Sequence, residues 1–153
     1  MQETVDGAYV VLLVIPAEPR WLALSRLVLS GICQLGRIDD ETLADLKLAV
    51  SEACSNSVRH AYGENDGGDV EVRYRLQSET FMVEVADAGR GFQLDRPLPE
   101  LGPRPGEDLR EDEMGLAIIH ALVDEVEVGA GPEGRGTTLR LRKYLDPGPD
   151  GSS

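Results

Sequence analysis

Two segments of alternating hydrophobicity, separated by only a few residues, constrain the fold of this chain most strongly. In DVEVRYRL (residues 69–76) every second residue is apolar, and the same period of two recurs in FMVEVAD (residues 81–87). This period places the apolar side chains of a β-strand on one face and the polar ones on the other. With QSET between them, the segments predict an antiparallel hairpin. The second alternation also places Asp87 on the buried side, together with Phe81, Val83 and Val85.

The segment before this hairpin has the period of a helix. IDDETLADLKLAVSEACSNSVRHAYG (residues 38–63) predicts a long helix with Asp39 or Asp40 as its N-cap and Gly63 as its stop. Its apolar face is predicted to hold Leu43, Leu46, Val50, Ala53, Ser57 and Ala61. Glu52, Asn56 and His60 follow at four-residue intervals and form a stripe at the edge of that face. Such a stripe can handle protons or a metal, or it can be a solvated face.

The remaining elements alternate between strand and helix. We expect strands at AYVVLLVI (residues 8–15), VEVGA (126–130) and TTLRLRKY (137–144), and helices at about 18–35 and over MGLAIIHALVDEV (114–126). Residues 93–113 are rich in proline and charge and are longer than an ordinary connection, which is typical of a functional lid or of disorder. These elements predict one α/β domain over residues 1–145, followed by a disordered tail at 146–153.

The composition excludes several classes of function. A net charge of −13 disfavours direct binding to nucleic acid or to an anionic membrane. No apolar run approaches the roughly 18 residues of a membrane span, and the first residues lack a basic signal segment, so we expect a cytoplasmic protein. Cys33 and Cys54 lie in apolar helical patterns without nearby metal-ligand partners, which favours buried thiols over a disulfide or a zinc site.

Four separated pieces could meet at one pocket. They are the helix stripe, the segment DAGRGF (residues 87–92), the helix start at Met114 and Gly115, and the strand start at residues 136–138. Glycine allows the backbone to approach a flat ligand closely, because no Cβ intervenes. A D-x-G-x-G after a strand is equally typical of a turn with a solvated aspartate. The spacing alone therefore leaves both interpretations open.

The order of these pieces resembles the nucleotide-binding domain of the GHKL (Bergerat-fold) ATPases. The phrases SEACSNSVRHAY (residues 51–62) and GTTLRLRK (136–143) are most similar to the anti-sigma factor serine kinases of the RsbW and SpoIIAB type. The resemblance covers about residues 8–144. It implies a two-layer α/β sandwich in which a mixed, mostly antiparallel sheet is covered on one face by helices. It also implies ATP and Mg²⁺ as cofactors, and an ATP lid at about residues 93–113.

The resemblance assigns roles to matching residues. Glu52 would be the catalytic base that takes the proton of a serine hydroxyl, and Asn56 would bind Mg²⁺ through its amide oxygen. Asp87 would accept a hydrogen bond from the adenine amino group. Thr137 would support it, because the alternation places Thr137 rather than Thr138 on the face of Leu139 and Leu141. The nucleotide site would comprise Asn56, His60, Asp87, Gly89, Gly91, Met114, Gly115 and Thr137. For His60, packing at the helix end is an equal alternative, and for His120 we expect a structural role.

The function implied is that of an ATP-dependent serine protein kinase and anti-sigma factor. Such a protein binds a sigma factor and phosphorylates an anti-anti-sigma (STAS-type) antagonist in a partner switch, and the resemblance allows a homodimer. The spacing between Arg26 and Glu52 resembles that of an arginine that contacts partner proteins in this family, although a solvated side chain is the simpler interpretation.

The sequence departs from the family pattern just before the helix at Met114. REDEMG (residues 110–115) keeps only Gly115 where related proteins carry several glycines. Glu111, Asp112 and Glu113 would repel phosphate if they faced the site. A non-catalytic anti-sigma or partner-switch module with weak or no ATP turnover is therefore the alternative function.

Overall fold

The computed structural model describes residues 4–5, 8–61, 68–87, 111–130 and 136–145; side chains are described for 8–59, 68–87, 114–130 and 136–145. The strands are β1 (Thr4–Val5), β2 (Ala8–Pro16), β3 (Asp69–Leu76), β4 (Thr80–Asp87), β5 (Glu125–Ala130) and β6 (Thr137–Tyr144). The helices are a 3₁₀ turn η1 (Pro19–Trp21), α1 (Leu22–Leu35), α2 (Asp40–Ala61) and α3 (Glu111–Leu122).

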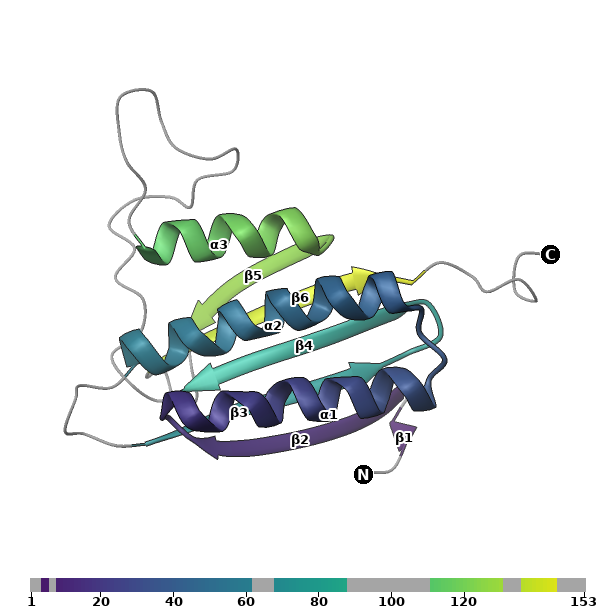
Figure 1. Cartoon of the computed structure of the whole chain (residues 1–153), viewed down its shortest axis with the longest axis horizontal. Coiled ribbons are helices and arrows are strands. Elements are labelled where there is room, and N and C mark those ends of the chain that lie inside the picture. The colour runs from purple at the N-terminus through teal and green to yellow at the C-terminus, as the bar shows by residue number, and fades with distance from the viewer. Residues whose placement is uncertain (1–3, 6–7, 62–67, 88–110, 131–135, 146–153) are drawn as a thin grey trace, which may run out of the picture.

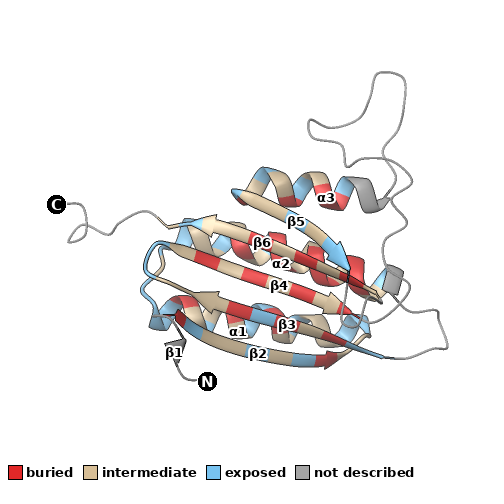
Figure 2. Ribbon diagram, turned by 180° about the vertical axis from the view of Figure 1, so that it is seen from behind, coloured by how far each residue is buried: buried red, intermediate tan, exposed pale blue. Residues whose placement is uncertain are grey.

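The described strands form one sheet in the order β1-β2-β3-β4-β6-β5, and each neighbouring pair is antiparallel. The three α-helices lie on one face of this sheet, and no described helix covers the other face (Figures 1 and 2). The α/β sandwich with helices on one face is thereby confirmed, but the expectation of a mixed sheet is wrong, because every described strand pair is antiparallel. The hairpin predicted around QSET is also confirmed, since β3 pairs with β4 and the backbone N–H of Gln77 donates to the Thr80 carbonyl.

The core lies between the sheet and the helices. In β4 every second residue, from Phe81 to Asp87, is buried, as the alternation predicted. The helices contribute the opposite wall of the core with Leu29, Cys33, Leu46, Val50, Ala53, Cys54, Leu116 and Ile119, all almost fully buried. Each large apolar side chain that is removed from water contributes about 1.5–3 kcal/mol, so this layer supplies most of the driving force for folding.

Three helix boundaries differ from the prediction. The helix expected from residue 18 begins as the 3₁₀ turn at Pro19 and becomes α-helical only at Leu22. The helix expected from Met114 begins at Glu111 and ends at Leu122 rather than near residue 126. Its acidic first turn has no apolar period to mark it, yet negative charge is favourable at a helix N-terminus. For α2, the N-cap is Asp39, while the predicted stop at Gly63 lies outside the described residues.

Among the described helices, none is long and apolar enough to cross a membrane. Cys33 and Cys54 are buried in α1 and α2, and both thiols are free. The predicted tail at 146–153 lies outside the described residues.

Candidate functional site

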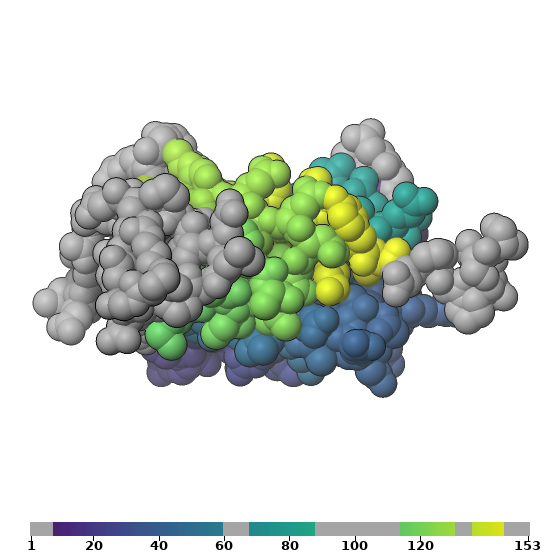
Figure 3. All heavy atoms as spheres, turned by 90° about the horizontal axis from the view of Figure 1, so that it is seen from above, coloured from purple at the N-terminus to yellow at the C-terminus, as the bar shows by residue number. Residues whose placement is uncertain are grey.

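The start of α3 brings Gly115 against two polar side chains of α2. A Cβ on Gly115 would lie 3.0 Å from Glu52 Oε2, 3.2 Å from Asn56 Nδ2 and 3.3 Å from Asn56 Oδ1. Gly115 is itself buried, whereas its neighbour Met114 is half exposed. In the space-filling view, α3 and α2 lie next to each other on the surface (Figure 3). Gly115 of α3 therefore lies close to the carboxylate of Glu52 and the amide of Asn56, which are about sixty residues earlier in the sequence.

The carboxamide of Asn56 is fully buried, and its two polar atoms differ in their partners. Its Oδ1 accepts a hydrogen bond from Arg59 Nη2 at 2.5 Å. Its Nδ2 has no hydrogen-bond partner within the described part of the chain. A buried donor without a partner costs about 1–3 kcal/mol, and such groups in folded proteins call for an explanation. A ligand at this point would supply the missing partner.

Asp87 lies at the end of β4, beside the start of β6. It is buried with only 3% of its surface exposed, and its Oδ1 accepts a hydrogen bond at 3.3 Å from the backbone N–H of Thr137. Thr137 is its register partner and is also buried. A carboxylate needs hydrogen-bond donors to remain charged in such a place. An exocyclic amino group of a base is a donor of the required kind.

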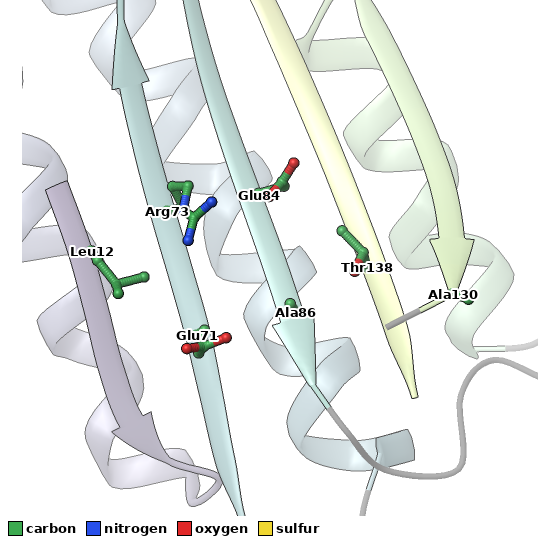
Figure 4. A pocket seen from close by; sticks show the side chains of 7 residues that line it. All are labelled: Leu12, Glu71, Arg73, Glu84, Ala86, Ala130 and Thr138. Atoms are coloured by element: carbon green, nitrogen blue, oxygen red, sulfur yellow. The ribbon is translucent and has the colours of Figure 1, made fainter. Parts of the chain in front are cut away.

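Thr138 has the opposite orientation from Thr137. It lines a depression on the uncovered face of the sheet, together with residues that include Glu71, Arg73 and Glu84 (Figure 4). The helices lie behind the sheet in that view. Thr137 is thus the threonine on the helix side of the sheet, where Asp87 lies.

Several predicted site residues cannot be placed. Gly89, Gly91 and the lid segment at residues 93–110 lie outside the described residues. His60 belongs to the last turn of α2 and Glu111–Glu113 to the first turn of α3, but the structure does not describe their side chains. His120 is half buried on α3.

Arg26 lies on the exposed surface of α1, next to the segment that carries Glu52. Its Nη1 donates to Ser51 Oγ at 3.4 Å, and Ser51 precedes Glu52 in α2. The exposed guanidinium of Arg26 therefore lies near Glu52, the first residue of the polar stripe on α2. It is available to contact another molecule.

A comparison with family models matches residues 15–143 to the histidine kinase-like ATPase domain. The chain belongs to this family. Among its relatives, the serine-protein kinase RsbW of Bacillus subtilis is 39% identical over 137 residues, which cover 86% of this chain and 83% of the relative. The serine-protein kinase RsbW of Bacillus pumilus is 39% identical over 153 residues, which cover 95% and 90%. The resemblance to RsbW-type kinases is confirmed.

Solved structures show the same fold. The RsbU and RsbW domains of Rv1364c from Mycobacterium tuberculosis match with a TM-score of 0.64 at 22% identity, over 90% of this chain and 32% of that one. The histidine kinase domain of the blue-light activated histidine kinase EL346 from Erythrobacter litoralis matches with a TM-score of 0.51 at 28% identity, over 86% and 62%. Glu52, Asn56 and Gly115 thus lie within the part of this chain that matches the fold of these solved structures.

The donor set fits Mg²⁺, the metal ion that nucleotide phosphates usually carry. An amide oxygen is a hard ligand, and Mg²⁺ is commonly held by one or two protein oxygens together with phosphates and waters. In the described part of the chain, no group of three or more histidine, cysteine, aspartate or glutamate side chains could hold a metal alone. Among the described residues of the stripe, Asn56 could hold such an ion through its amide oxygen.

Sequence reasoning missed Arg59, which contacts the central residue of the stripe. The signal was present, because residues three apart on a helix are neighbours on its surface.

Proposed function

We propose that this chain is an ATP-dependent serine protein kinase and anti-sigma factor, which binds a sigma factor and phosphorylates a STAS-type antagonist in a partner switch. The proposal rests on one observation above all, the approach of Gly115 to Glu52 and Asn56 at the start of α3. Relatives that are named serine-protein kinase RsbW support the reaction class.

The geometry suits phosphoryl transfer to a hydroxyl. Glu52 and Asn56 are one helical turn apart, which corresponds to about 5–6 Å between their Cβ atoms. Glu52 is half buried and can accept the proton of an incoming serine, while Asn56 is fully buried and offers its oxygen to the metal. Phosphoryl transfer needs little beyond such positioning and charge stabilisation. The N-terminus of α3 would offer backbone N–H groups to phosphate, provided that the acidic side chains of Glu111, Asp112 and Glu113 face away from it.

The other end of the nucleotide would lie at Asp87 and Thr137. Asp87 would accept a hydrogen bond from the adenine amino group, and the buried Thr137 would hold its carboxylate in place through the backbone N–H. We assign Gly89 and Gly91 to the backbone that passes the base and sugar, with Met114 and His60 at the edges of the site. A cytoplasmic location follows from this function.

The partner surface would include Arg26, which is exposed beside Ser51 and hence near the proposed base. Because the chain carries a net charge of −13, complementary basic surfaces on its partners would speed association.

Mutation of Glu52 tests the reaction directly. The purified chain is incubated with Mg²⁺, ATP and the STAS-domain antagonist of the same organism, and phosphoserine is measured by mass spectrometry. Glu52→Gln should lower the rate constant about 10²–10⁴-fold, because general-base assistance has about that magnitude. Binding of a fluorescent ATP analogue should persist in Glu52→Gln and should be lost in Asp87→Asn.

Glu71→Gln is the matched control, since Glu71 lies on the uncovered face of the sheet, away from the site. It should phosphorylate the antagonist at the wild-type rate. Antagonist and sigma-factor binding without any phosphoserine, at the same affinity with and without ATP, would instead identify a non-catalytic partner-switch module.

A further inference from the structure

Arg59 reaches from the surface to the buried amide of the proposed site. It lies three residues beyond Asn56 on α2, so the two side chains share one side of the helix. Arg59 itself is exposed, whereas Asn56 has no exposed surface. Its Nη2 nevertheless donates to Asn56 Oδ1 at 2.5 Å, and the charge of the guanidinium strengthens this hydrogen bond.

This hydrogen bond engages the atom that the proposed function assigns to Mg²⁺. The carboxamide of Asn56 has a single oxygen, and its nitrogen is a donor that cannot bind a cation. A carbonyl oxygen has two lone pairs, but a guanidinium and a divalent cation on the same oxygen repel each other strongly at such short range. The close packing of Gly115 against both amide atoms leaves Asn56 little room to turn a different face to the metal.

We propose that Arg59 is a positioning residue that sets the Mg²⁺ requirement of the site, because it competes with the metal for Asn56 Oδ1. The inference rests on the proposed function. The hydrogen bond from Arg59 would have to break before Asn56 Oδ1 could bind the metal–nucleotide complex. The free energy of breaking this bond would lower the affinity for Mg²⁺. A chain without this guanidinium would load metal and nucleotide at a lower free Mg²⁺ concentration.

The test is a Mg²⁺ titration of nucleotide binding, measured by the fluorescence anisotropy of a non-hydrolysable, fluorescent ATP analogue at a fixed concentration. In Arg59→Met the half-saturating Mg²⁺ concentration should fall about 3- to 10-fold, which is in the range expected for removing one intramolecular hydrogen bond that opposes binding. Arg59→Lys keeps a positive charge and a donor and should stay near the wild-type value. Arg59→Gln removes the charge but keeps a polar side chain, and its half-saturating Mg²⁺ concentration should fall as it does in Arg59→Met.

Arg73→Met is the matched control, because it removes the same charge from the uncovered face of the sheet (Figure 4). It should leave the Mg²⁺ midpoint unchanged. An unchanged or higher midpoint in both neutral Arg59 variants, with wild-type melting temperatures, overturns the inference and leaves the kinase proposal intact. Failure of the wild-type chain to bind the analogue at any Mg²⁺ concentration removes the proposed function, and the inference with it.

Discussion

At the scale of single residues, Gly115 decides how closely α3 approaches the proposed base and metal ligand. In Gly115→Ala the new methyl group would lie 3.0 Å from Glu52 Oε2 and would force that carboxylate or the Asn56 amide to move. Contacts of 3.0–3.3 Å require these side chains to shift by a few tenths of an ångström. A misplacement of about 1 Å can lower a rate about 100-fold, so we expect this smaller shift to lower phosphoserine formation by about three- to tenfold, measured with the STAS-domain antagonist as substrate.

The same substitution should change folding stability little. Alanine is favoured over glycine by about 1 kcal/mol inside a helix, which offsets part of the crowding. Gly31→Ala is the matched control, since Gly31 is exposed in α1 and a Cβ there would meet nothing within 4 Å. That variant should gain about 0.5–1 kcal/mol in unfolding free energy at unchanged activity. Wild-type activity in Gly115→Ala would show that this contact does not shape the site.

At the scale of elements, the position of α2 depends on its N-cap. Asp39 Oδ2 accepts a hydrogen bond from the Thr42 backbone N–H at 3.1 Å, and its Oδ1 accepts one from the Thr42 hydroxyl at 2.7 Å. Asp39→Ala should lower the unfolding free energy by about 1 kcal/mol near neutral pH. Denaturant unfolding measures this loss.

The cap should also depend on pH. The Thr42 hydroxyl, followed by the Thr42 backbone N–H, lowers the pKa of the Asp39 carboxyl below its ordinary 3.8. A lowered pKa contributes stability that is present above the ordinary value and is lost as the pH falls through the folded value. The difference between wild type and Asp39→Ala should therefore shrink below about pH 4. Asp39→Asn keeps a capping side chain without the titrating charge, so it should be nearly as stable as wild type at neutral pH. An equal loss in Asp39→Asn would contradict the cap.

Much of the element pattern could be predicted because it follows from periodicity. The hairpin of β3 and β4, the long helix α2 and the buried side of Asp87 all depend on side-chain spacing within one segment. The two-residue strand β1 is too short to carry a period, and the acidic first turn of α3 has no apolar residue to mark it. Of the site, Glu52 and Asn56 could be recognised as a stripe. The approach of Gly115 is a contact between distant segments, which spacing within either one cannot reveal.

At the scale of the whole molecule, the helix-free face of the sheet carries paired charges over three of its strands. Arg140 lies 2.6 Å from Glu84 and 3.3 Å from Glu127, and Arg142 lies 3.3 Å from Glu125. These pairs join three adjacent strands, β4, β6 and β5, across their outer side. Each exposed pair adds little stability, so the two layers must be held together mainly from the inside. The core supplies apolar contact there, together with one buried polar link.

That link is Tyr74, which spans from the sheet to the helices. Its hydroxyl donates to the Ser25 carbonyl at 2.8 Å, and its side chain is 1% exposed. Tyr74→Phe leaves that buried carbonyl without this donor and should cost about 1–2 kcal/mol of unfolding free energy near neutral pH. Denaturant unfolding of both proteins between about pH 8 and pH 11 checks the prediction.

The alkaline range tests whether this hydroxyl is buried. Burial, followed by the charge of Cys54, raises the pKa of Tyr74 above its ordinary 10, so its stabilising effect is complete below pH 10 and is lost as the pH rises further. Burial likewise raises the pKa of Cys33 to about 11 and that of Cys54 to about 12, from 9.0, and these thiols are present in both proteins. The wild type should therefore lose stability faster than Tyr74→Phe above pH 10, and the difference between them should narrow. Parallel curves through this range would mean that the Tyr74 hydroxyl is not held neutral in the folded protein, because only a group that stays neutral in the fold and ionises in the unfolded chain produces the extra slope.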